Sequence, residues 1–542
     1  MNTFKQYFKV NALIICALLV SLITNAQDPD QYGTPYSGVP DAPDAVIYQV
    51  NMRCFSSTRN FQGVINRLDN IKALGVNVIY LMPFYPVGNK NAFNSPYCIK
   101  DLKAVGSEFG TLTDLRNLVD KAHEKGMAVM IDWVANQTSW DHPWITAHKD
   151  WYVQDASGNI KQFSTYSDVA ALNFSDTSMR AAMIDAMRYW VFTANIDGFR
   201  CDFANNPPID FWQQAITSLR GITSHKLLLL AEGDRTANYT AGFDFNFGFN
   251  FYYNSILPIY KNNSPATLIN NSNTSEYSYA SANQRVARYL SNHDIYGSDG
   301  SPYTIFKGKK GTLAAFVLAS YMKSVPFIYN GMEVGNTVAM PFPFTSSVIN
   351  WTQDVTITPE MTKIITIHNN SNAIRRGSLV TYSNTDVCAF KKEFETEQIF
   401  VLSNLRNAPK TFTLPLGIAN TTMYDEINNT YITLGNSISL SFYEYKVLSK
   451  VIPISIPQSG KSSSTTTSIY PNPATKGMVT VHLPKRGSYS TVKIFDVQGR
   501  NCYEDALPES ESMLDLSRLM KGIYLIQINS DGKQEYHKIL IK

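Results

Sequence analysis

Residues 198–202 read Gly-Phe-Arg-Cys-Asp, a short apolar run that ends in the carboxylate of Asp202. The same order, an apolar run followed by an acid, occurs at Asp132, Glu232 and Asp294. Short apolar runs bounded by loops are typical of buried strands in a parallel sheet. Acids at the carboxyl ends of such strands converge on one face of a β/α barrel, where its active sites lie. The pattern therefore predicts a barrel hydrolase that works with carboxylates.

The rest of the chain divides by its periodicity. Strand-like and helix-like segments alternate over residues 44–376, which predicts the barrel domain. Residues 137–175 interrupt this rhythm, and we interpret them as a small inserted domain. Residues 377–452 change to short alternating strands, which indicates an antiparallel β domain. The Ser-, Thr- and Pro-rich residues 453–467 predict a linker, and residues 468–542 predict a further small all-β unit.

Individual barrel elements follow from the same patterns. The spacing of residues 61–74 predicts one helix that ends before Gly75, and residues 111–125 predict another. The sixth strand has the weakest pattern, and we assign it to residues 243–253.

The amino terminus has the pattern of a secretory signal peptide over residues 1–26. Lys5 and Lys9 precede an apolar stretch at residues 12–23, and small residues follow at 24–26. The apolar stretch is short for a membrane span. We therefore expect export with cleavage, and an uncleaved signal anchor is the alternative.

Composition narrows the classes of function. The 542 residues carry a net charge of +3 and no Lys/Arg block, which argues against a nucleic-acid partner. The six cysteines are widely spaced, so they predict neither a disulfide framework nor a zinc site. Aromatic residues make up 12% of the chain, and aromatic faces suit the apolar C–H groups of sugar rings, although cores account for most of them.

Two of the acids suit the cleavage of a glycosidic bond. A retaining mechanism needs a nucleophilic carboxylate and an acid roughly 5–5.5 Å apart, and Asp202 and Glu232 end consecutive predicted strands. Arg200 lies on the same strand face as Asp202, so its guanidinium is expected to lower the pKa of that carboxyl. The apolar run before Glu232 is expected to raise the pKa of Glu232, as an acid/base requires. His293, beside Asp294, supplies a donor and an acceptor for sugar hydroxyls.

Several short motifs follow one another along the predicted barrel domain. They are residues 95–97 (Ser-Pro-Tyr), 109–111 (Phe-Gly-Thr), 132–136 (Asp-Trp-Val-Ala-Asn), 198–202, 230–232 (Leu-Ala-Glu) and 291–294 (Ser-Asn-His-Asp). Together they resemble the conserved regions of the α-amylase family, glycoside hydrolase family 13. The resemblance covers most of the predicted barrel domain. It implies a (β/α)8 barrel, a short inserted domain after the third strand and a β domain behind it. It also implies retention of configuration at α-glucosidic bonds and no organic cofactor.

The resemblance also implies roles for single residues. Asp202 would be the nucleophile, Glu232 the acid/base, and Asp294 the acid that stabilises the transition state. Further residues would bind the sugar at the cleavage point: Arg200, His293, Asp132, Tyr97 and Gln137.

Three departures from the family pattern affect this site. The family commonly has His after the first-region Asn, where this chain has Gln137, so we expect a weaker or altered grip on the sugar. Its frequent Lys-His pair is replaced by Asn205 and Asn206, and residues 171–173 lack the acid usual for structural calcium. Asn136 remains as a candidate calcium ligand, but one amide is a poor site for a cation that takes several oxygens.

The carboxyl-terminal unit has a resemblance of its own. Residues 468–474 (Ser-Ile-Tyr-Pro-Asn-Pro-Ala), 495–500 and 522–526 resemble the sorting domain of the type IX secretion system. This implies export across the inner and outer membranes to the medium or cell surface, with the secretion machinery as partner. A small carbohydrate-binding module is the alternative.

The sequence therefore predicts a secreted α-amylase-type hydrolase acting on α-1,4 bonds of starch, related α-glucans or maltooligosaccharides, and we expect a monomer. The alternatives within the family are an α-glucosidase, a cyclodextrin-degrading enzyme and a transglycosylase. A glucan-binding protein on an inactive barrel is the alternative from another class.

Overall fold

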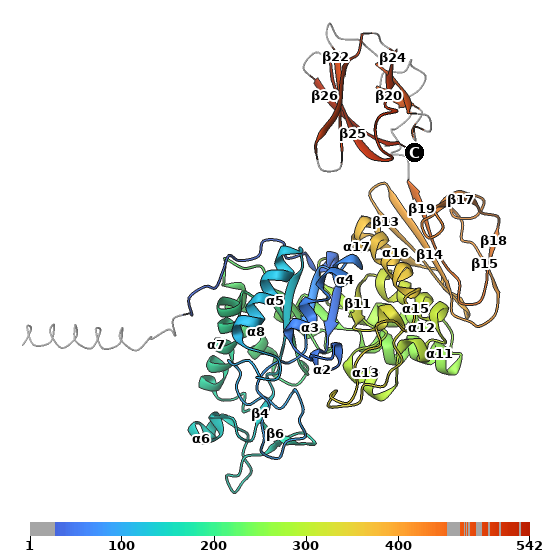
Figure 1. The fold of residues 1–542 in the computed structure, drawn as a ribbon. Helices are drawn as coiled ribbons and strands as arrows, with labels where there is room; N and C mark the ends of the chain where they lie inside the picture. Colours follow the sequence, from blue (N-terminus) through green and yellow to red (C-terminus); the bar gives the residue numbers. More distant parts are fainter. Residues whose placement is uncertain are drawn as a thin grey trace, which may run out of the picture. The chain divides into compact units, whose positions relative to one another are not determined.

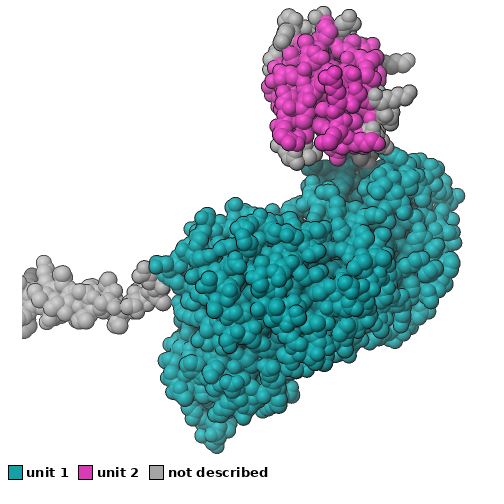
Figure 2. All heavy atoms as spheres, in the orientation of Figure 1, with its two compact units in different colours: residues 1–453 teal, residues 454–542 magenta. Residues whose placement is uncertain are grey.

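The structure, a computed structural model, forms two compact units, residues 1–453 and 454–542 (Figure 2). It describes residues 28–451 continuously and residues 467–541 with gaps at 471, 473, 475–476, 484–489, 497–498, 509–510 and 531–532. The predicted signal peptide and residues 453–466 of the predicted linker lie outside the described residues. Among the helices described, none is long and apolar enough to cross a membrane.

The first unit contains a closed barrel in the order β1-β11-β10-β9-β8-β7-β3-β2 (Figure 1). Every neighbouring pair is parallel. The strands are β1 (Ile47–Val50), β2 (Val78–Leu81), β3 (Ala128–Trp133), β7 (Gly198–Cys201), β8 (Leu228–Ala231), β9 (Phe245–Phe247), β10 (Arg285–Arg288) and β11 (Ser324–Tyr329). This confirms the predicted barrel, and the burial of every strand residue explains the apolar runs in the sequence.

Helices alternate with these strands and pack around them. The helix predicted for residues 61–74 is instead two short helices, because the chain leaves helical geometry at Arg67. The helix predicted for residues 111–125 is present, and Thr111 caps it through a capping box with Asp114. The principal helices are α3 (Phe61–Ile65), α4 (Leu68–Ala73), α5 (Leu112–Glu124), α7 (Thr177–Ala194), α8 (Ile209–Arg220), α9 (Ala237–Ala241), α11 (Leu257–Asn262), α12 (Leu268–Glu276), α13 (His293–Ser298), α14 (Pro302–Ile305), α15 (Lys309–Tyr321), α16 (Ile357–Asn370) and α17 (Asn372–Arg376).

The sixth strand is shorter than predicted. β9 covers only Phe245–Phe247, and the chain then turns into α10 (Phe249–Phe251) and the π-helix η3 (Tyr252–Ile256). The turn begins at Gly248, where a Cβ would lie 2.9 Å from the Cα of Arg288 on β10. The aromatic residues continue from the strand into the buried side of the helix, so apolar spacing alone does not separate the two elements.

A small domain is inserted after β3, where the sequence shows no clear period. Its strands β4 (Gln137–Ser139), β5 (Gln162–Phe163) and β6 (Tyr166–Ala171) form an antiparallel sheet in the order β4-β6-β5. A short helix, α6 (Trp144–Ala147), and a 3-10 turn, η2 (Lys149–Trp151), complete it. Strands this short hold too few residues for a visible alternation.

An antiparallel β domain follows the barrel, as predicted. A sheet in the order β12-β13-β14-β19-β16-β17 is accompanied by the pair β15-β18. The strands are β12 (Ser378–Thr381), β13 (Val387–Phe394), β14 (Glu397–Asn404), β15 (Lys410–Thr413), β16 (Thr422–Asp425), β17 (Thr430–Thr433), β18 (Ser437–Leu440) and β19 (Tyr445–Val451).

The second unit is all β in the part that the structure describes. Two antiparallel sheets have the orders β20-β21-β24 and β23-β22-β25-β26. Their strands are β20 (Ser468–Tyr470), β21 (Met478–His482), β22 (Ser490–Phe495), β23 (Asn501–Ala506), β24 (Glu511–Asp515), β25 (Gly522–Ser530) and β26 (Lys533–Ile541). Its hydrophobic cluster is drawn from residues of this unit alone, including Val479, Ile494 and Ile526.

Candidate active site

Arg200 is the centre of a cluster of acids from three adjacent barrel strands. Its side chain is 1% exposed on β7. Its Nη1 lies 2.8 Å from Asp132 Oδ1 and 2.8 Å from Asp202 Oδ1, and its Nη2 pairs with Glu232 Oε1. The register of β3 and β7 sets Asp132 directly beside Arg200. One guanidinium therefore brings together three of the four acids that the sequence singled out.

Asp132 lies within β3, one residue before the strand ends, and is completely buried. The hydroxyls of Tyr80 and Tyr97 donate to its Oδ2 at 2.5 and 3.1 Å, and that of Tyr85 donates to its carbonyl oxygen at 2.7 Å. Burial raises the pKa of Asp132, and Arg200 opposes this shift. These contacts fix the carboxyl, so Asp132 orients its neighbours.

His293 is tied to this cluster through Tyr97. The Tyr97 hydroxyl lies 2.9 Å from His293 Nε2, and Gln49 Nε2 lies 2.9 Å from His293 Nδ1. Because the Tyr97 hydroxyl donates to Asp132, its oxygen accepts from His293 Nε2–H, and Nδ1 accepts from the Gln49 amide. Burial and the Arg200 cation lower the pKa of His293 to about 4. The imidazole is therefore neutral, with its proton on Nε2.

The expected electrostatics of Asp202 need a correction. Burial and the Glu232 carboxylate raise the pKa of Asp202 well above its ordinary value, and Arg200 only partly opposes them. Arg200 thus lowers this pKa as predicted, but burial and Glu232 outweigh it, so the net pKa is raised and not lowered. One cation faces three carboxyls, so the charge of Arg200 does not offset the burial of Asp202.

Asp294 stands apart from the Arg200 cluster. The strand predicted to lead into it ends at Arg288, and Asp294 instead lies in the first turn of α13. The side chain of Asn292 caps this helix by accepting from Asp294 N and Ile295 N, both at 2.9 Å. The side chain of Asp294 is 63% exposed. Asp294 Oδ1 lies 3.3 Å from His293 Nε2, and this contact connects Asp294 to the site. Asp294 is therefore free to meet a ligand.

Gln137 begins β4 of the inserted domain and is buried. Its Oε1 has no hydrogen-bond partner among the described residues, and no bond between its side chain and the Arg200 cluster is found in this part of the chain. Its predicted contact with substrate therefore remains a prediction.

The residues around Asn136 do not fit a calcium site. Asn136 Nδ2 donates to the carbonyl of Asp202 at 3.1 Å, and its Oδ1 accepts from Asn206 Nδ2 at 2.8 Å. The oxygen that would bind the cation thus already has an amide donor. Within the described residues, no group of three His, Cys, Asp or Glu side chains could hold a metal ion.

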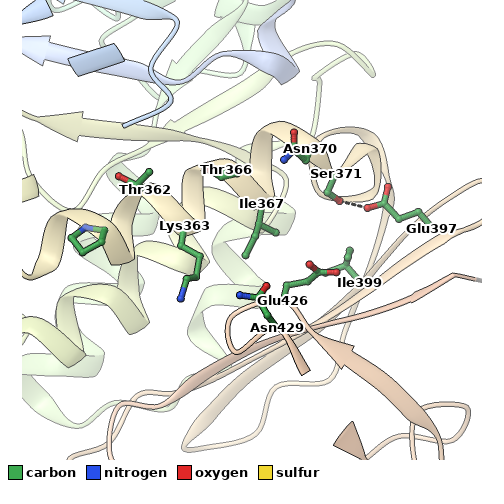
Figure 3. Close-up of a pocket in the computed structure, with 11 residues that line it drawn as sticks. Thr362, Lys363, Thr366, Ile367, Asn370, Ser371, Glu397, Ile399, Glu426 and Asn429 are labelled. Carbon is green, nitrogen blue, oxygen red and sulfur yellow. Dashed lines mark hydrogen bonds between the residues drawn. The ribbon is translucent and has the colours of Figure 1, made fainter. Parts of the chain in front are cut away.

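A hollow of about 470 Å³ lies between α16 and strands of the β domain (Figure 3). No residue of the Arg200 cluster lines it. Its two carboxylates have internal partners: Glu397 accepts from Ser371 and Ala373, and Glu426 accepts from Ser449. The lining holds no aromatic ring. The hollow therefore lacks the features of a sugar site.

Sequence reasoning missed three residues of the site: Gln49, Tyr80 and Tyr85. Gln49 and Tyr80 each lie within an apolar strand, and both are buried. A polar group inside a fully buried strand needs a hydrogen-bond partner, and this was the available signal.

The fold and the clustered acids define a glycosidase of the β/α-barrel class. The family model for the alpha amylase catalytic domain matches residues 54–164 and 146–390. The model for the secretion system C-terminal sorting domain matches residues 468–542. The chain belongs to the α-amylase family of glycoside hydrolases, and its last unit is a type IX sorting domain.

Relatives of several activities resemble the chain. Alpha-amylase 3 of Dictyoglomus thermophilum is 23% identical over 478 residues, which cover 75% of this chain and 92% of that protein. The probable oligo-1,6-glucosidase 2 of Bacillus subtilis is 29% identical over 29% of this chain and 34% of its own length. The crystal structure of an alpha-amylase from Lactobacillus plantarum matches with a TM-score of 0.69 at 24% identity, covering 76% of this chain and 99% of its own. The family is therefore fixed, whereas the specific reaction is not.

Proposed function

We propose that this enzyme hydrolyses internal α-1,4-glucosidic bonds of starch or related α-glucans with retention of anomeric configuration. The binding of Asp202 and Glu232 to one guanidinium carries this proposal. Arg200 Nη1 binds the Asp202 carboxyl and Nη2 binds the Glu232 carboxyl, so the two carboxyls lie close together. Retaining glycosidases need a separation of roughly 5–5.5 Å, whereas inverting ones need about 6.5–9.5 Å.

In the first step, Asp202 attacks the anomeric carbon while the bond from that carbon to the glycosidic oxygen breaks. Arg200 holds Asp202 Oδ1, so Oδ2 is the attacking oxygen. Glu232 gives its proton to the departing oxygen, and a glycosyl ester forms on Asp202. In the second step, Glu232 takes a proton from water, whose oxygen attacks the same carbon and releases Asp202.

The sugar being cleaved is bound by the neighbouring polar groups. The exposed carboxyl of Asp294 accepts from ring hydroxyls, and neutral His293 donates from Nε2 when a hydroxyl replaces Tyr97 as its partner. The ring of Tyr97 stacks on that of His293, with centroids 5.5 Å apart, and offers an apolar surface. Asp132 and Arg200 keep these groups in place.

Activity of the Glu232→Gln and Asp202→Asn variants on soluble starch tests the proposal. Each variant should lose about 10²–10⁴-fold or more in kcat/KM, because each removes a group that acts on the reacting atoms. Asp69→Asn changes an acid that is 85% exposed and should leave activity unchanged. Full activity of the Glu232→Gln variant would refute the assignment.

A time course of products from starch, maltose and cyclodextrin separates the alternatives. Mixed oligosaccharides from starch at early times indicate internal cleavage, whereas glucose alone indicates an α-glucosidase. Rapid cyclodextrin opening or longer products indicate the other two reactions. Binding of starch without turnover by the unaltered protein would indicate an inactive glucan-binding protein.

We also propose that the enzyme acts outside the cell or at its surface. The sorting domain at residues 468–542 supports export through the secretion machinery. Deleting residues 468–542 should therefore keep the enzyme in the cell.

A further inference from the structure

Phe203 is an exposed aromatic residue placed directly at the reacting groups. It follows Asp202, and its backbone N–H donates to Glu232 Oε2 at 2.7 Å. Its side chain is 48% exposed, and its φ of 46° lies in the left-handed region, where a bulky residue is unfavourable. A strained backbone that holds a large apolar ring in solvent beside an acid/base suggests a role in binding.

Two aromatic residues of the inserted domain pack next to Phe203, the buried Phe163 and the exposed Tyr166. The ring of Phe163 on β5 meets that of Phe203 edge-on, with centroids 5.9 Å apart. Tyr166 on β6 stacks on Phe163 with centroids 6.2 Å apart, and Tyr166 is 55% exposed. We call Phe203, Phe163 and Tyr166 the aromatic platform. It joins the barrel to the inserted domain.

The polar side chains next to Phe203 are occupied by protein partners. Asn205 Nδ2 donates to Asp234 Oδ1 at 2.8 Å, and Asn205 Oδ1 accepts from Arg235 N at 3.3 Å. Asn206 donates to Asn136, as described above. Asn205 and Asn206 are exposed like Phe203, but their amides are bonded to protein partners, whereas the Phe203 ring is an exposed apolar surface.

The position of the platform indicates which part of a substrate it meets. Asp132, Tyr97 and His293 lie toward β1, β2 and β3, where the ring to be cleaved would bind. Phe203 follows β7, and its backbone N–H bonds the proposed proton donor Glu232, which follows the next strand, β8. The group that receives the proton from Glu232 leaves in this direction.

We propose that the aromatic platform binds the glucosyl unit on the leaving-group side of the scissile bond. The inference rests on the proposed function, because it takes Glu232 as the donor to the leaving oxygen. The apolar C–H face of the sugar packs on Phe203, and Phe163 supports that ring from behind.

Two substrates that differ in their leaving group test the platform. Maltotetraose leaves a sugar on the Phe203 side, whereas α-maltosyl fluoride leaves only fluoride. The Phe203→Ala variant should lose about 3–10-fold in kcat/KM on maltotetraose, as expected for one aromatic contact. It should keep its kcat/KM on α-maltosyl fluoride within twofold. Phe203→Tyr should restore maltotetraose cleavage.

The fluoride reaction also reports whether the variant is folded, since it needs Asp202 to form the glycosyl ester and Glu232 to activate the water that releases it. Tyr279→Ala, at another exposed aromatic residue outside the site, should change neither reaction. Equal losses on both substrates, or no loss on either, would overturn the platform. If the unaltered enzyme cleaves both substrates, a failed platform leaves the proposed hydrolysis standing; if it cleaves neither substrate, both proposals fall.

Discussion

Gln49 should control the protonation of His293. In the structure, the Gln49 amide donates to His293 Nδ1, which leaves the imidazole proton on Nε2 toward Tyr97. Changing Gln49 to Glu replaces a donor with an acceptor. A carboxylate at position 49 can only accept a hydrogen bond, so His293 must carry a proton on Nδ1. Both the other neutral tautomer and the imidazolium carry that proton.

The size of the effect follows from the bonds involved. A Gln49→Met variant loses one buried hydrogen bond, about 1–1.5 kcal/mol, and should lose about tenfold in kcat/KM. In Gln49→Glu, a charge-assisted bond of about 1.5–3 kcal/mol favours the imidazolium, which raises the pKa of His293 by about 1–2 units from its value of about 4. Since the imidazolium forms as pH falls, the acid limb of activity should move to higher pH.

The assay is the pH dependence of kcat/KM on α-maltosyl fluoride between about pH 4 and 8. The acid limb of Gln49→Glu should lie about 1–2 units above that of the unaltered enzyme, whereas Gln49→Met should show a lower plateau with an unmoved limb. Gln62→Glu, on the exposed side of α3, controls for added negative charge. Superimposable profiles for Gln49→Glu and Gln62→Glu would refute the reasoning.

Four further predictions concern stability, calcium, the inserted domain and export. Lys392 is 1% exposed and donates to the Ile374 carbonyl, and burial with three nearby cations lowers its pKa well below the ordinary value. The unfolded chain therefore binds more protons than the folded one, so the free energy of unfolding rises with pH toward about 10.4. Lys392→Met should raise the free energy of unfolding by about 1–3 kcal/mol at pH 7, and this gain should shrink near pH 10. Urea unfolding measures this, and a loss at pH 7 would contradict it. Because Asn206 occupies the Asn136 oxygen, a chelator should leave the melting temperature unchanged, and a clear fall would restore the calcium site. Gln137→His should strengthen binding at the cleavage point, seen as a lower KM on starch, and unchanged kinetics would remove Gln137 from the site. Deleting residues 468–542 should stop export while the retained protein stays active on starch, and undiminished export would favour a carbohydrate-binding role for this unit.

The sequence was most informative where a strand ends directly in a functional acid. Asp202 and Glu232 each follow their strand by one residue, so a simple apolar run located both. Asp294 escaped this rule because Asn292 starts a helix ahead of it, and a capping side chain resembles any loop residue in a sequence. The aromatic run after Phe245 made the predicted sixth strand too long for a related reason. Its residues are buried both in β9 and in the helix that follows, so the apolar pattern does not mark where the strand ends.

The interior of the site was less predictable. Gln49 and Tyr80 act through partners that are distant in the chain, and spacing along one strand does not identify such partners. The pKa of Asp202 depends first on its burial and then on the carboxyls that share Arg200 with it, and only the closed barrel reveals either. Strand order and apolar pattern were thus readable, whereas the balance of charge was not.

The sharing of one guanidinium constrains how this enzyme can evolve. Any substitution at Asp132, Asp202 or Glu232 redistributes the single positive charge among the two acids that remain. Effects of substitutions within such a network do not add. Substitutions at the three positions are therefore expected to occur together. A protein that lost one of the acids would gain little activity from restoring it unless the other two acids were also in place.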